Sequence, residues 1–565
     1  MRAESLRLAA LVDARWEEAL DNAPLLRLRE GVPVDRLPDA GFERAERQAI
    51  RDQRFLDSLR AIDPELLEPS ERITLETLTW ETRMAVEGHR FFWLRSALTP
   101  YSSAFRLYGQ LFPQLPLETP EDLARYVELV EQVPAHVRSV RDHASGQFER
   151  GVVVSAANLE PVVGIVRAQA GSPDAGPFGL AEVRTRGLDA DAVAAARERI
   201  AAVVSDSIAP ALEDLARWLE GPYRERAPDG VGVSRYPDGR DYYLYLTRLH
   251  TTMEVTPEEV RDAGYELLAD FRRRMAEIRD RIGWTGSAEE FHAHLRGDPR
   301  YFPRTPDEIG ERLEAAAARM TGRMPDLFAT SPDAPWAARR LAPELEPSMT
   351  YGFYAPPTST EPHGIYFYNG SSLDERSWLG LTAISLHELL PGHHYQIART
   401  LENEALPDYR RNSYYTAFSE GWGSYASFLG LEAGVFEDPY SEYGLYILES
   451  FLATRLVVDP GMNYFGMTLE EARAFMRENT LESETQIATE SLRYSTDMPG
   501  QALAYQMGKR RLLELRADAQ SRLGPSFDIR AFHETVLDQG SLPLVVLEGR
   551  VERWVEQSSG DRDDR

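Results

Sequence analysis

The chain has 565 residues, with 63 Lys and Arg against 91 Asp and Glu, and its formal net charge is −28. This length allows an extensive core, and the acidity argues against a nucleic-acid partner because no basic face replaces phosphate counterions. The chain has no cysteine, which excludes disulfides and thiolate ligands. It has no run of about 18 apolar residues, so we expect no membrane span and no membrane partner. The N-terminal residues lack a secretory signal pattern, and together these features predict a cytoplasmic protein.

Helix signals dominate in chain order. A threonine, a proline and two acids, the pattern of an N-cap followed by a first helical turn, occur at residues 119–122, 256–259 and 305–308. Thr468 starts a fourth helix with a capping-box glutamate at Glu471. After Thr256, apolar residues recur at helical spacing and predict one buried stripe. Long helices are also expected over residues 193–219 and 304–328.

Strand signals are few. Residues 349–355 and 365–369 are rich in aromatic side chains and are bounded by Pro, Gly, Ser and Asn. Residues 168–178 are rich in Gly and Pro and predict a loop. We expect a mainly α-helical fold with a small β element at the edge of a central cleft. Its expected parts, which form one continuous body, are an N-terminal side of the cleft (1–340), a catalytic part (341–557) and a disordered tail (558–565).

Residues 387–394 carry the chemistry, and they read His-Glu-Leu-Leu-Pro-Gly-His-His. Imidazoles beside a carboxylate are the groups that hold a metal ion and activate water for hydrolysis. The segment resembles the zinc-peptidase pattern His-Glu-x-x-His, but Pro391 occupies the position of the second histidine. Proline lacks the N–H that a regular helix requires there, so the helix must open or bulge.

An opened turn would bring His393 to the place of the second histidine. A regular helix would instead put His394 on the face of His387, so the spacing leaves both histidines as candidates. The best third ligand is Glu420, an acid in an apolar segment where burial is costly unless a cation binds it. Gly421 and Gly423 would allow two helices to approach closely at this point.

These motifs resemble a bacterial domain-of-unknown-function family, DUF885, whose signature is His-Glu-x-x-Pro-Gly-His-x-x-Gln. The chain matches it from His387 to Gln396, and it also matches the family's Ser-Glu-Gly-Trp segment at 419–422 and its Arg-Tyr-x4-Pro-Gly-Gln-Ala-Leu-x-Tyr block at 493–505. Members resemble helical zinc carboxypeptidases and oligopeptidases of the glutamate-ligand zincin group. The resemblance therefore implies a zincin-like metallopeptidase fold and one Zn²⁺ per chain.

The same resemblance implies that His387, His393 and Glu420 bind the metal and that Glu388 is the general base. It thereby favours His393 over His394. One departure is Asn463, which stands where members tend to carry a histidine. If that histidine binds substrate or an oxyanion, Asn463 puts activity in doubt.

Hydrolysis of an amide also needs a donor for the oxyanion and groups that hold the substrate. Tyr494 and Tyr505 are the candidate donors. The candidate substrate-binding residues are Arg493 and Gln501, together with Tyr366, Tyr368 and Asn369 of the second strand, which we expect to pair with an extended peptide as an edge strand.

We therefore expect a zinc hydrolase that cleaves short peptides, as a carboxypeptidase or oligopeptidase. The alternatives are a metal-dependent amidase or esterase acting on a small molecule, and a metal-binding protein without turnover. The sequence does not indicate an oligomeric state.

Overall fold

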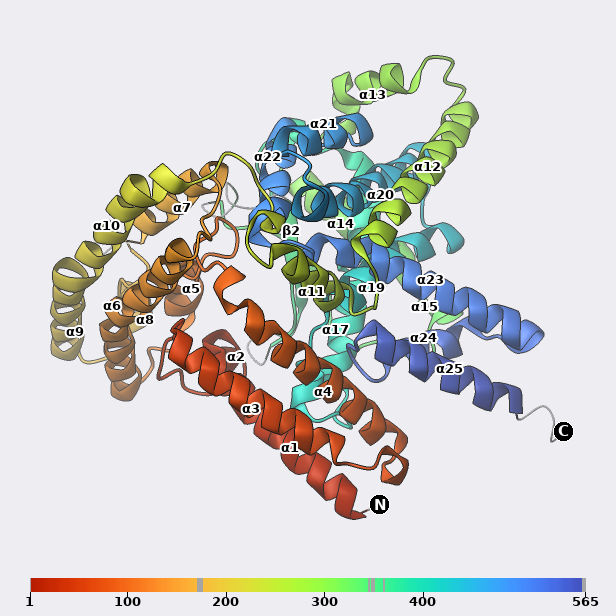
Figure 1. Ribbon diagram of the computed structural model, residues 1–565. Helices are drawn as coiled ribbons and strands as arrows, with labels where there is room; N and C mark the ends of the chain where they lie inside the picture. Colours follow the sequence, from red (N-terminus) through yellow and green to blue (C-terminus); the bar gives the residue numbers. More distant parts are fainter. Residues whose placement is uncertain (1, 170–175, 344–345, 347–350, 359–360, 561–565) are drawn as a thin grey trace. The chain divides into compact units, whose positions relative to one another are not determined.

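The computed structural model describes residues 2–169, 176–343, 346, 351–358 and 361–560, and most of its elements are helices (Figure 1). The mainly α-helical class expected from the sequence is confirmed. The chain forms two compact units. Unit 1 comprises Met1–Leu66, Glu81–Tyr243 and Ser495–Pro499, and unit 2 comprises Leu67–Trp80, Leu244–Tyr494 and Gly500–Arg565.

Unit 1 is built from helices alone among its described residues. They are α1 (Arg2–Asn22), α2 (Pro24–Arg29), α3 (Phe42–Arg60), α5 (Arg106–Leu111), α6 (Pro120–Glu149), α7 (Ala156–Ala168), α8 (Glu182–Thr185), α9 (Ala190–Val203) and α10 (Ala209–Trp218), while α4 (Pro69–Gly88) and α11 (Gly239–Thr251) contribute residues to both units.

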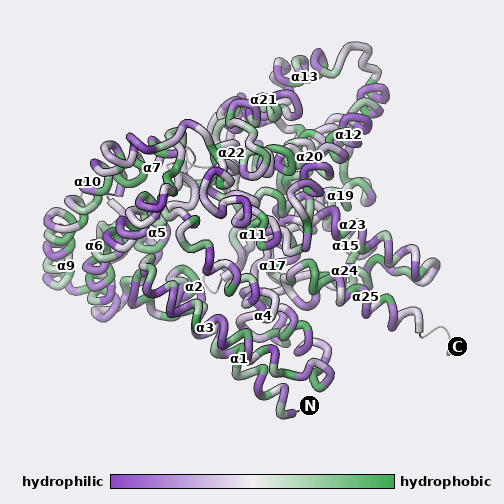
Figure 2. The backbone as a smooth tube through the Cα atoms, viewed as in Figure 1, coloured by the Kyte–Doolittle hydropathy of each residue, from purple (hydrophilic) through white to green (hydrophobic). Residues whose placement is uncertain are grey.

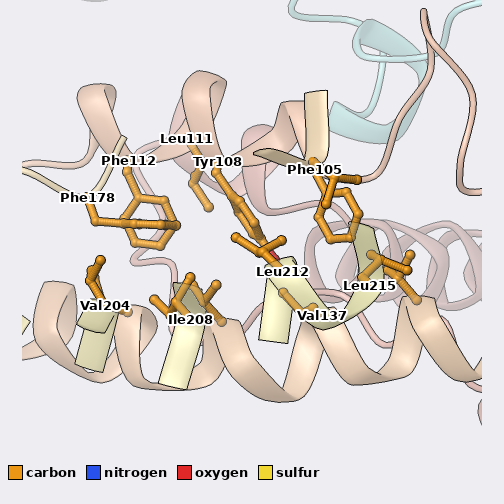
Figure 3. Packing of buried hydrophobic residues seen from close by; sticks show 14 of the residues in the cluster. Phe105, Tyr108, Leu111, Phe112, Val137, Phe178, Val204, Ile208, Leu212 and Leu215 are labelled. Atoms are coloured by element: carbon orange, nitrogen blue, oxygen red, sulfur yellow. The ribbon is translucent and has the colours of Figure 1, made fainter. Parts of the chain in front are cut away.

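The core of unit 1 is a layer of aromatic and aliphatic side chains. Figure 3 shows the rings of Phe105, Tyr108 and Phe112 above the aliphatic side chains of Ile208 and Leu212. The rings of Phe112 and Phe178 meet edge-on, with their centroids 4.9 Å apart. Buried aromatic pairs add to the stability that area burial supplies, so this layer holds the helices of unit 1 together.

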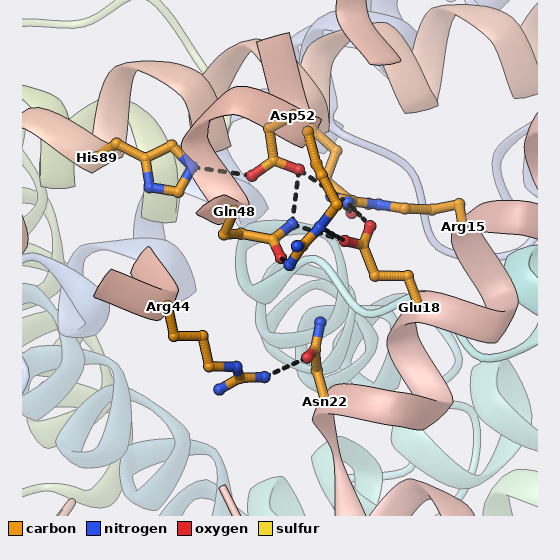
Figure 4. A network of polar contacts seen from close by, with 9 residues as sticks. Arg15, Glu18, Asn22, Arg44, Gln48, Asp52 and His89 are labelled. Atoms are coloured by element: carbon orange, nitrogen blue, oxygen red, sulfur yellow. Dashed lines mark hydrogen bonds and ion pairs between the residues drawn. The ribbon is translucent and has the colours of Figure 1, made fainter. Parts of the chain in front are cut away.

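A polar network ties α1 to α3 in unit 1 (Figure 4). The carboxylate of Asp52 accepts hydrogen bonds from Arg15 Nη1 at 3.2 Å, Gln48 Nε2 at 3.0 Å and His89 Nε2 at 2.9 Å. Glu18 accepts from Arg15 and Gln48 as well. Asp52 is buried, and these donors compensate the desolvation of its carboxylate.

Unit 2 contains the remaining helices and a small sheet. The helices are α12 (Pro257–Ile282), α13 (Ala288–Gly297), α14 (Asp307–Thr321), α15 (Met324–Leu327), α16 (Leu381–Glu388), α17 (His393–Glu402), α18 (Asp408–Arg411), α19 (Thr416–Glu432), α20 (Pro439–Pro460), α21 (Leu469–Asn479), α22 (Glu484–Leu492), α23 (Ala504–Leu523), α24 (Ile529–Leu537) and α25 (Leu544–Gly560). Residues 244–340, expected from the sequence to belong to the N-terminal part, lie in unit 2, where α12 packs along α20 and α14 against α16.

The sheet has three strands in the order β1-β3-β2, formed by β1 (Trp336–Arg340), β2 (Gly352–Ala355) and β3 (Gly364–Tyr368). β3 pairs with β1 in parallel and with β2 in antiparallel orientation. The sequence predicted β2 and β3 but not β1, whose Ala-Ala-Arg-Arg stretch carries no strand signal. Of the first predicted strand, residues 349–350 lie outside the described residues.

The predicted helix starts are found with small differences. Thr119, Thr256 and Thr468 each cap a helix in a capping box. α14 begins one residue later than expected, with Pro306 rather than Thr305 before its first residue. The predicted buried stripe of α12 is present, although Tyr265 is exposed.

Two expected long helices are interrupted. Residues 204–208 between α9 and α10 form a π-helical turn, because Pro210 has no N–H to continue the regular pattern. α14 ends at Thr321 and the short α15 follows two residues later. Most of the expected 168–178 loop and residues 561–565 of the expected tail lie outside the described residues, whereas residues 558–560 continue α25.

Hydrophilic residues alternate with hydrophobic ones along helices such as α1 and α3 (Figure 2). In the part of the chain that the structure describes, no helix combines the length and the apolar composition that crossing a membrane requires.

α19 and α23 approach each other closely at two glycines. A Cβ on Gly508 would lie 2.0 Å from the carbonyl oxygen of Ala417, and one on Gly421 would lie 2.6 Å from the Gly508 backbone. The helix that carries Glu420 is therefore held at backbone-contact distance from α23.

We expect Gly508→Ala to lower the free energy of unfolding of the protein by about 1–3 kcal/mol, because the added methyl group overpacks this contact. Denaturant unfolding followed by circular dichroism measures the change. The control is Gly297→Ala at the exposed end of α13, where a Cβ meets no atom within 4 Å. Equal stability of both variants would contradict the close packing of α19 and α23.

Candidate metal centre

The candidate centre begins at a break between two helices. α16 ends at Glu388 and α17 begins at His393, as Pro391 predicted. The indole Nε1 of Trp422 donates a hydrogen bond of 2.8 Å to the carbonyl of Pro391. Gly392 packs against the carbonyl of His387, from which an added Cβ would be only 1.8 Å away. The break is therefore held by packing that leaves no room for a larger residue.

The break brings three side chains together. Oε2 of Glu420 on α19 lies 3.4 Å from Nε2 of His387 and 3.3 Å from Nε2 of His393. Ligands about 2.0 Å from a zinc ion at the corners of a tetrahedron lie about 3.3 Å apart. The carboxylate of Glu420 thus lies at the spacing of a neighbouring zinc ligand from each of the two imidazoles.

Glu388 lies beside these groups. Ligand atoms of His387, Glu388 and His393 all lie within 4.8 Å of one another. A base at this distance from a metal ligand can reach a water in the same site. The centre therefore combines two carboxylates, Glu388 and Glu420, with two imidazoles.

α19 positions His387 as well as supplying Glu420. A Cβ on Gly423 would lie 2.8 Å from the imidazole of His387, so the ring occupies the space that this glycine leaves. The hydroxyl of Ser427, one turn further, donates to the carbonyl of Ala383 in α16 at 2.9 Å. Of the two glycines expected at the contact, Gly423 faces the histidine helix, whereas Gly421 faces α23.

His394 points away from the centre. Its Nδ1 lies 3.1 Å from the hydroxyl of Tyr354, and its Nε2 lies 3.1 Å from the carbonyl oxygen of Ala334. Both nitrogens are engaged and the side chain is fully buried. The geometry therefore favours His393 over His394 as a ligand.

The charges of the centre are coupled. Burial acts to raise the pKa of Glu420, but the two imidazoles hold this pKa well below its usual range. Burial acts to lower the pKa of His393, and Glu420 raises it above its usual value. Burial raises the pKa of Glu388, and the negative charge of Glu420 adds to that effect. Glu420 thus has the character of an ionised carboxylate, and Glu388 that of a stronger base.

Two tyrosines adjoin the centre. The ring of Tyr505 stacks on the imidazole of His387 at a centroid distance of 6.2 Å and an interplanar angle of 19°. The hydroxyl of Tyr414 donates to Oε1 of Glu420 at 3.2 Å. Tyr414 precedes α19 and was not predicted from the sequence as a site residue, although it lies only six residues before Glu420, the predicted ligand.

Tyr494, Arg493 and Gln501 lie in a buried network around Glu490. The hydroxyl of Tyr494 donates to Glu490, and Nη1 of Arg493 pairs with the same carboxylate at 3.2 Å. Arg493 also donates to the side-chain oxygen of Gln501. Because Tyr494 is fully buried and bound to Glu490, its placement favours Tyr505 as the oxyanion donor.

Arg455 of α20 joins this network, although the sequence did not identify it as a candidate site residue. Its Nη2 lies 3.2 Å from Glu490, and its guanidinium lies over the ring of Tyr505, 4.7 Å from the ring centroid. Its position in the apolar run 451–458 could have indicated a buried ion pair, since a buried charge needs a partner.

Asn463 has a structural role. Its amide nitrogen donates to the carbonyl of Tyr494 at 2.7 Å and to the carbonyl and carboxylate of Asp459 at 3.0 and 3.1 Å. Asp459 in turn accepts from the backbone N–H of Gly500 at 3.0 Å. The residue thus links main-chain segments, and its contacts give no support to a loss of turnover.

The expected peptide-binding strand is differently placed. β3, which carries Tyr366 and Tyr368, is paired on both sides, so it cannot add a peptide as an edge strand and that expectation is wrong. The amide of Asn369 donates to the carbonyl of Glu346 at 2.8 Å and so holds a loop. Tyr366, Tyr368 and Asn369 nevertheless line a cavity, together with residues of α16.

Comparison with known proteins gives a family and a fold. Residues 24–551 match the family described as bacterial protein of unknown function, DUF885. A "putative lipoprotein" from Colwellia psychrerythraea has a TM-score of 0.90 at 23% identity, over 98% of this chain and 99% of that one. A "putative lipoprotein of unknown function" from Shewanella oneidensis has a TM-score of 0.72 at 17% identity, over 96% and 99%. No curated protein matches the chain.

A third structure, a "putative oligoendopeptidase F" from Bacillus anthracis, has a TM-score of 0.26 at 13% identity, over 92% of this chain and 96% of that one, and this similarity is too low to support an argument. The first two structures support the fold alone.

The cytoplasmic location expected from the sequence is wrong, because it conflicts with the description of the two similar structures as lipoproteins. The physical reason is that an absence of cysteines excludes disulfides in any compartment and does not indicate the cytoplasm. The family resemblance, in contrast, is confirmed. Since the family model covers residues 24–551, the chain belongs to the DUF885 family of bacterial proteins.

Proposed function

We propose that the protein is a zinc-dependent hydrolase and that it cleaves short peptides, as a carboxypeptidase or an oligopeptidase. The observation that carries this proposal is the position of Glu420 Oε2, 3.3–3.4 Å from the Nε2 atoms of His387 and His393. Two imidazoles and one carboxylate at this spacing are typical of a zinc site with an open position. A further acid beside them, here Glu388, is typical of a zinc site that hydrolyses its substrate.

The roles of the residues follow from their positions. A zinc ion held by His387, His393 and Glu420 would supply Lewis acidity toward a water and a substrate carbonyl. Glu388 accepts the proton of the attacking water and returns it to the leaving amine. Tyr505, with its half-buried ring against His387, donates its hydroxyl hydrogen to the oxygen that gains negative charge.

The metal content of the purified chain tests the proposed ligands. The purified chain should contain about one zinc per molecule, and His393→Ala should lose most of it because three protein ligands become two. His394→Ala is the matched control and should retain zinc, since both its ring nitrogens bond elsewhere. Elemental analysis after dialysis measures the zinc content of both variants. Zinc lost from His394→Ala but kept by His393→Ala would exchange the two roles.

A second prediction separates the base from the ligands. Glu388→Gln should keep its zinc but lose peptide hydrolysis by at least about a hundredfold, because the amide cannot accept the proton of water. Single-turnover assays with the zinc-loaded variant measure the loss, and elemental analysis confirms the metal. Activity close to that of the unmodified protein would remove Glu388 as the base.

The bond that is cleaved can be identified with a peptide library and mass spectrometry. Loss of single C-terminal residues is the result expected of a carboxypeptidase, and internal cuts are those of an oligopeptidase. If the zinc-loaded protein leaves all peptides intact, the peptidase proposal fails. Esterase and amidase substrates then test whether the centre hydrolyses other bonds.

A further inference from the structure

A cavity of about 500 Å³ lies in unit 2, and its lining includes residues of α16 and β3. This volume is in the range of pockets that hold small ligands. One wall is α16, where Ile384 lies one turn before Glu388. Another is β3, where burial, and then the charge of Glu388, raise the pKa of Tyr366. Ile384 and Tyr366 thus connect the wall of the cavity with the surroundings of Glu388, although Glu388 itself does not line the cavity.

The lining combines an apolar surface with an excess of acids. Four carboxyl side chains face two arginines: Glu346, Asp374, Glu375 and Glu482 against Arg296 and Arg376. Aliphatic side chains such as Ile447 and Leu448 and the rings of three tyrosines form the rest of the wall. Such a surface suits a ligand with an apolar stem and a positive charge.

Glu482 is the acid best placed to bind a charge. Its Oε2 accepts a hydrogen bond of 2.7 Å from the hydroxyl of Tyr351, and no cation lies within ion-pair distance of it among the described residues. In contrast, Glu346 is neutralised by Arg340 at 2.8 Å. Burial raises the pKa of Glu482 to about 7, with the charge of Glu490 adding to the effect. A ligand cation would supply the missing counterion.

A second group in the same wall also lacks a partner. Gln486, four residues after Glu482, is 9% exposed and lines the cavity. Its amide nitrogen has no hydrogen-bond partner in the part of the chain that the structure describes. Because buried polar groups are normally paired, this amide indicates that a polar ligand group completes the site.

We propose that this cavity is a specificity pocket that binds a cationic group of the substrate, an ammonium or a guanidinium, with Glu482 as its counterion. The proposal rests on the proposed function, since it assigns the substrate preference of the same centre. Gln486 donates to a carbonyl of the same ligand, and the aliphatic wall contacts the stem of the side chain. A neutral side chain would leave the carboxylate of Glu482 desolvated without compensation.

Three small probes test the proposal on the full-length chain as purified. Nα-acetyl-lysine amide carries a side-chain cation, Nα-acetyl-norleucine amide is its neutral analogue, and norleucine amide carries only an α-ammonium. Isothermal titration calorimetry gives the affinity of each. The lysine probe should bind about ten- to a hundredfold more tightly than the acetylated norleucine probe, as expected for a hydrogen bond between charged groups.

Glu482→Gln should bind these two probes equally, because its amide keeps the shape of the side chain and loses the charge. Glu484→Gln is the matched control; Glu484 is exposed, pairs with Arg477 and does not line the cavity. It should keep the preference of the unmodified chain. Equal binding of the two acetylated probes to the unmodified chain, or a preference that persists in Glu482→Gln, would overturn the proposal.

If norleucine amide binds more tightly than the lysine probe, again in dependence on Glu482, the cation is the amino terminus of a peptide rather than a side chain.

A measurement on the unmodified chain guards against misfolding of the variant. The preference for the lysine probe should weaken from pH 8.5 to pH 5.5, because a protonated Glu482 no longer attracts a cation. The titratable and charged groups around Glu482 are Tyr351, Glu490 and Arg455. A preference that does not change over this range would count against Glu482.

These outcomes are distinct from a failure of the proposed function. The probes report binding alone, so a chain without hydrolytic activity can still show the preference for a cation. Conversely, a chain that hydrolyses peptides but binds all probes equally keeps its proposed function and loses only this pocket.

Discussion

The carboxylate of Glu420 lies between two imidazoles that belong to different helices, and this arrangement depends on the break at Pro391. A continuous helix would carry His393 away from the face of His387. The break is stabilised from α19, the same helix that supplies Glu420, through the hydrogen bond from Trp422 to Pro391. One helix therefore supplies the carboxylate and holds the break that positions the two imidazoles.

Acidic and basic side chains lie between the centre and the cavity. Glu388 and Glu420 give the centre its negative charge, and Tyr505 separates it from the buried arginine Arg455. Beyond this arginine, Glu490 carries the balancing charge, and then Glu482 reaches the cavity wall. A dication at one end would meet Glu388, and a ligand cation at the other would meet Glu482. Neither carboxylate has an ion-pair partner among the residues that the structure describes.

Much of the fold and of the centre could be predicted from local sequence signals. Capping boxes at Thr119, Thr256 and Thr468 define helix starts because they satisfy backbone groups within four residues. Pro391 predicted the break in the same way, since the missing N–H is a local property.

The parts that the sequence did not predict depend on contacts between distant segments. The strand partners of β3 decide whether it lies at an edge, and its own aromatic pattern is the same in both cases. Likewise, His394 is withdrawn from the centre by Tyr354 and Ala334, 40 and 60 residues away along the chain. Arg455 acquires its partner Glu490 only when α20 meets α22, and Glu482 acquires Tyr351 from a segment 131 residues away along the chain.

The central claim is that two imidazoles and one carboxylate hold a single zinc ion. X-ray absorption spectroscopy of the zinc-loaded protein tests it most directly. The account predicts a four-coordinate ion with ligands at about 2.0 Å and the multiple-scattering pattern of two imidazoles, which His394→Ala should leave unchanged. A spectrum with three or more imidazoles, or one that loses an imidazole in His394→Ala, would contradict the account.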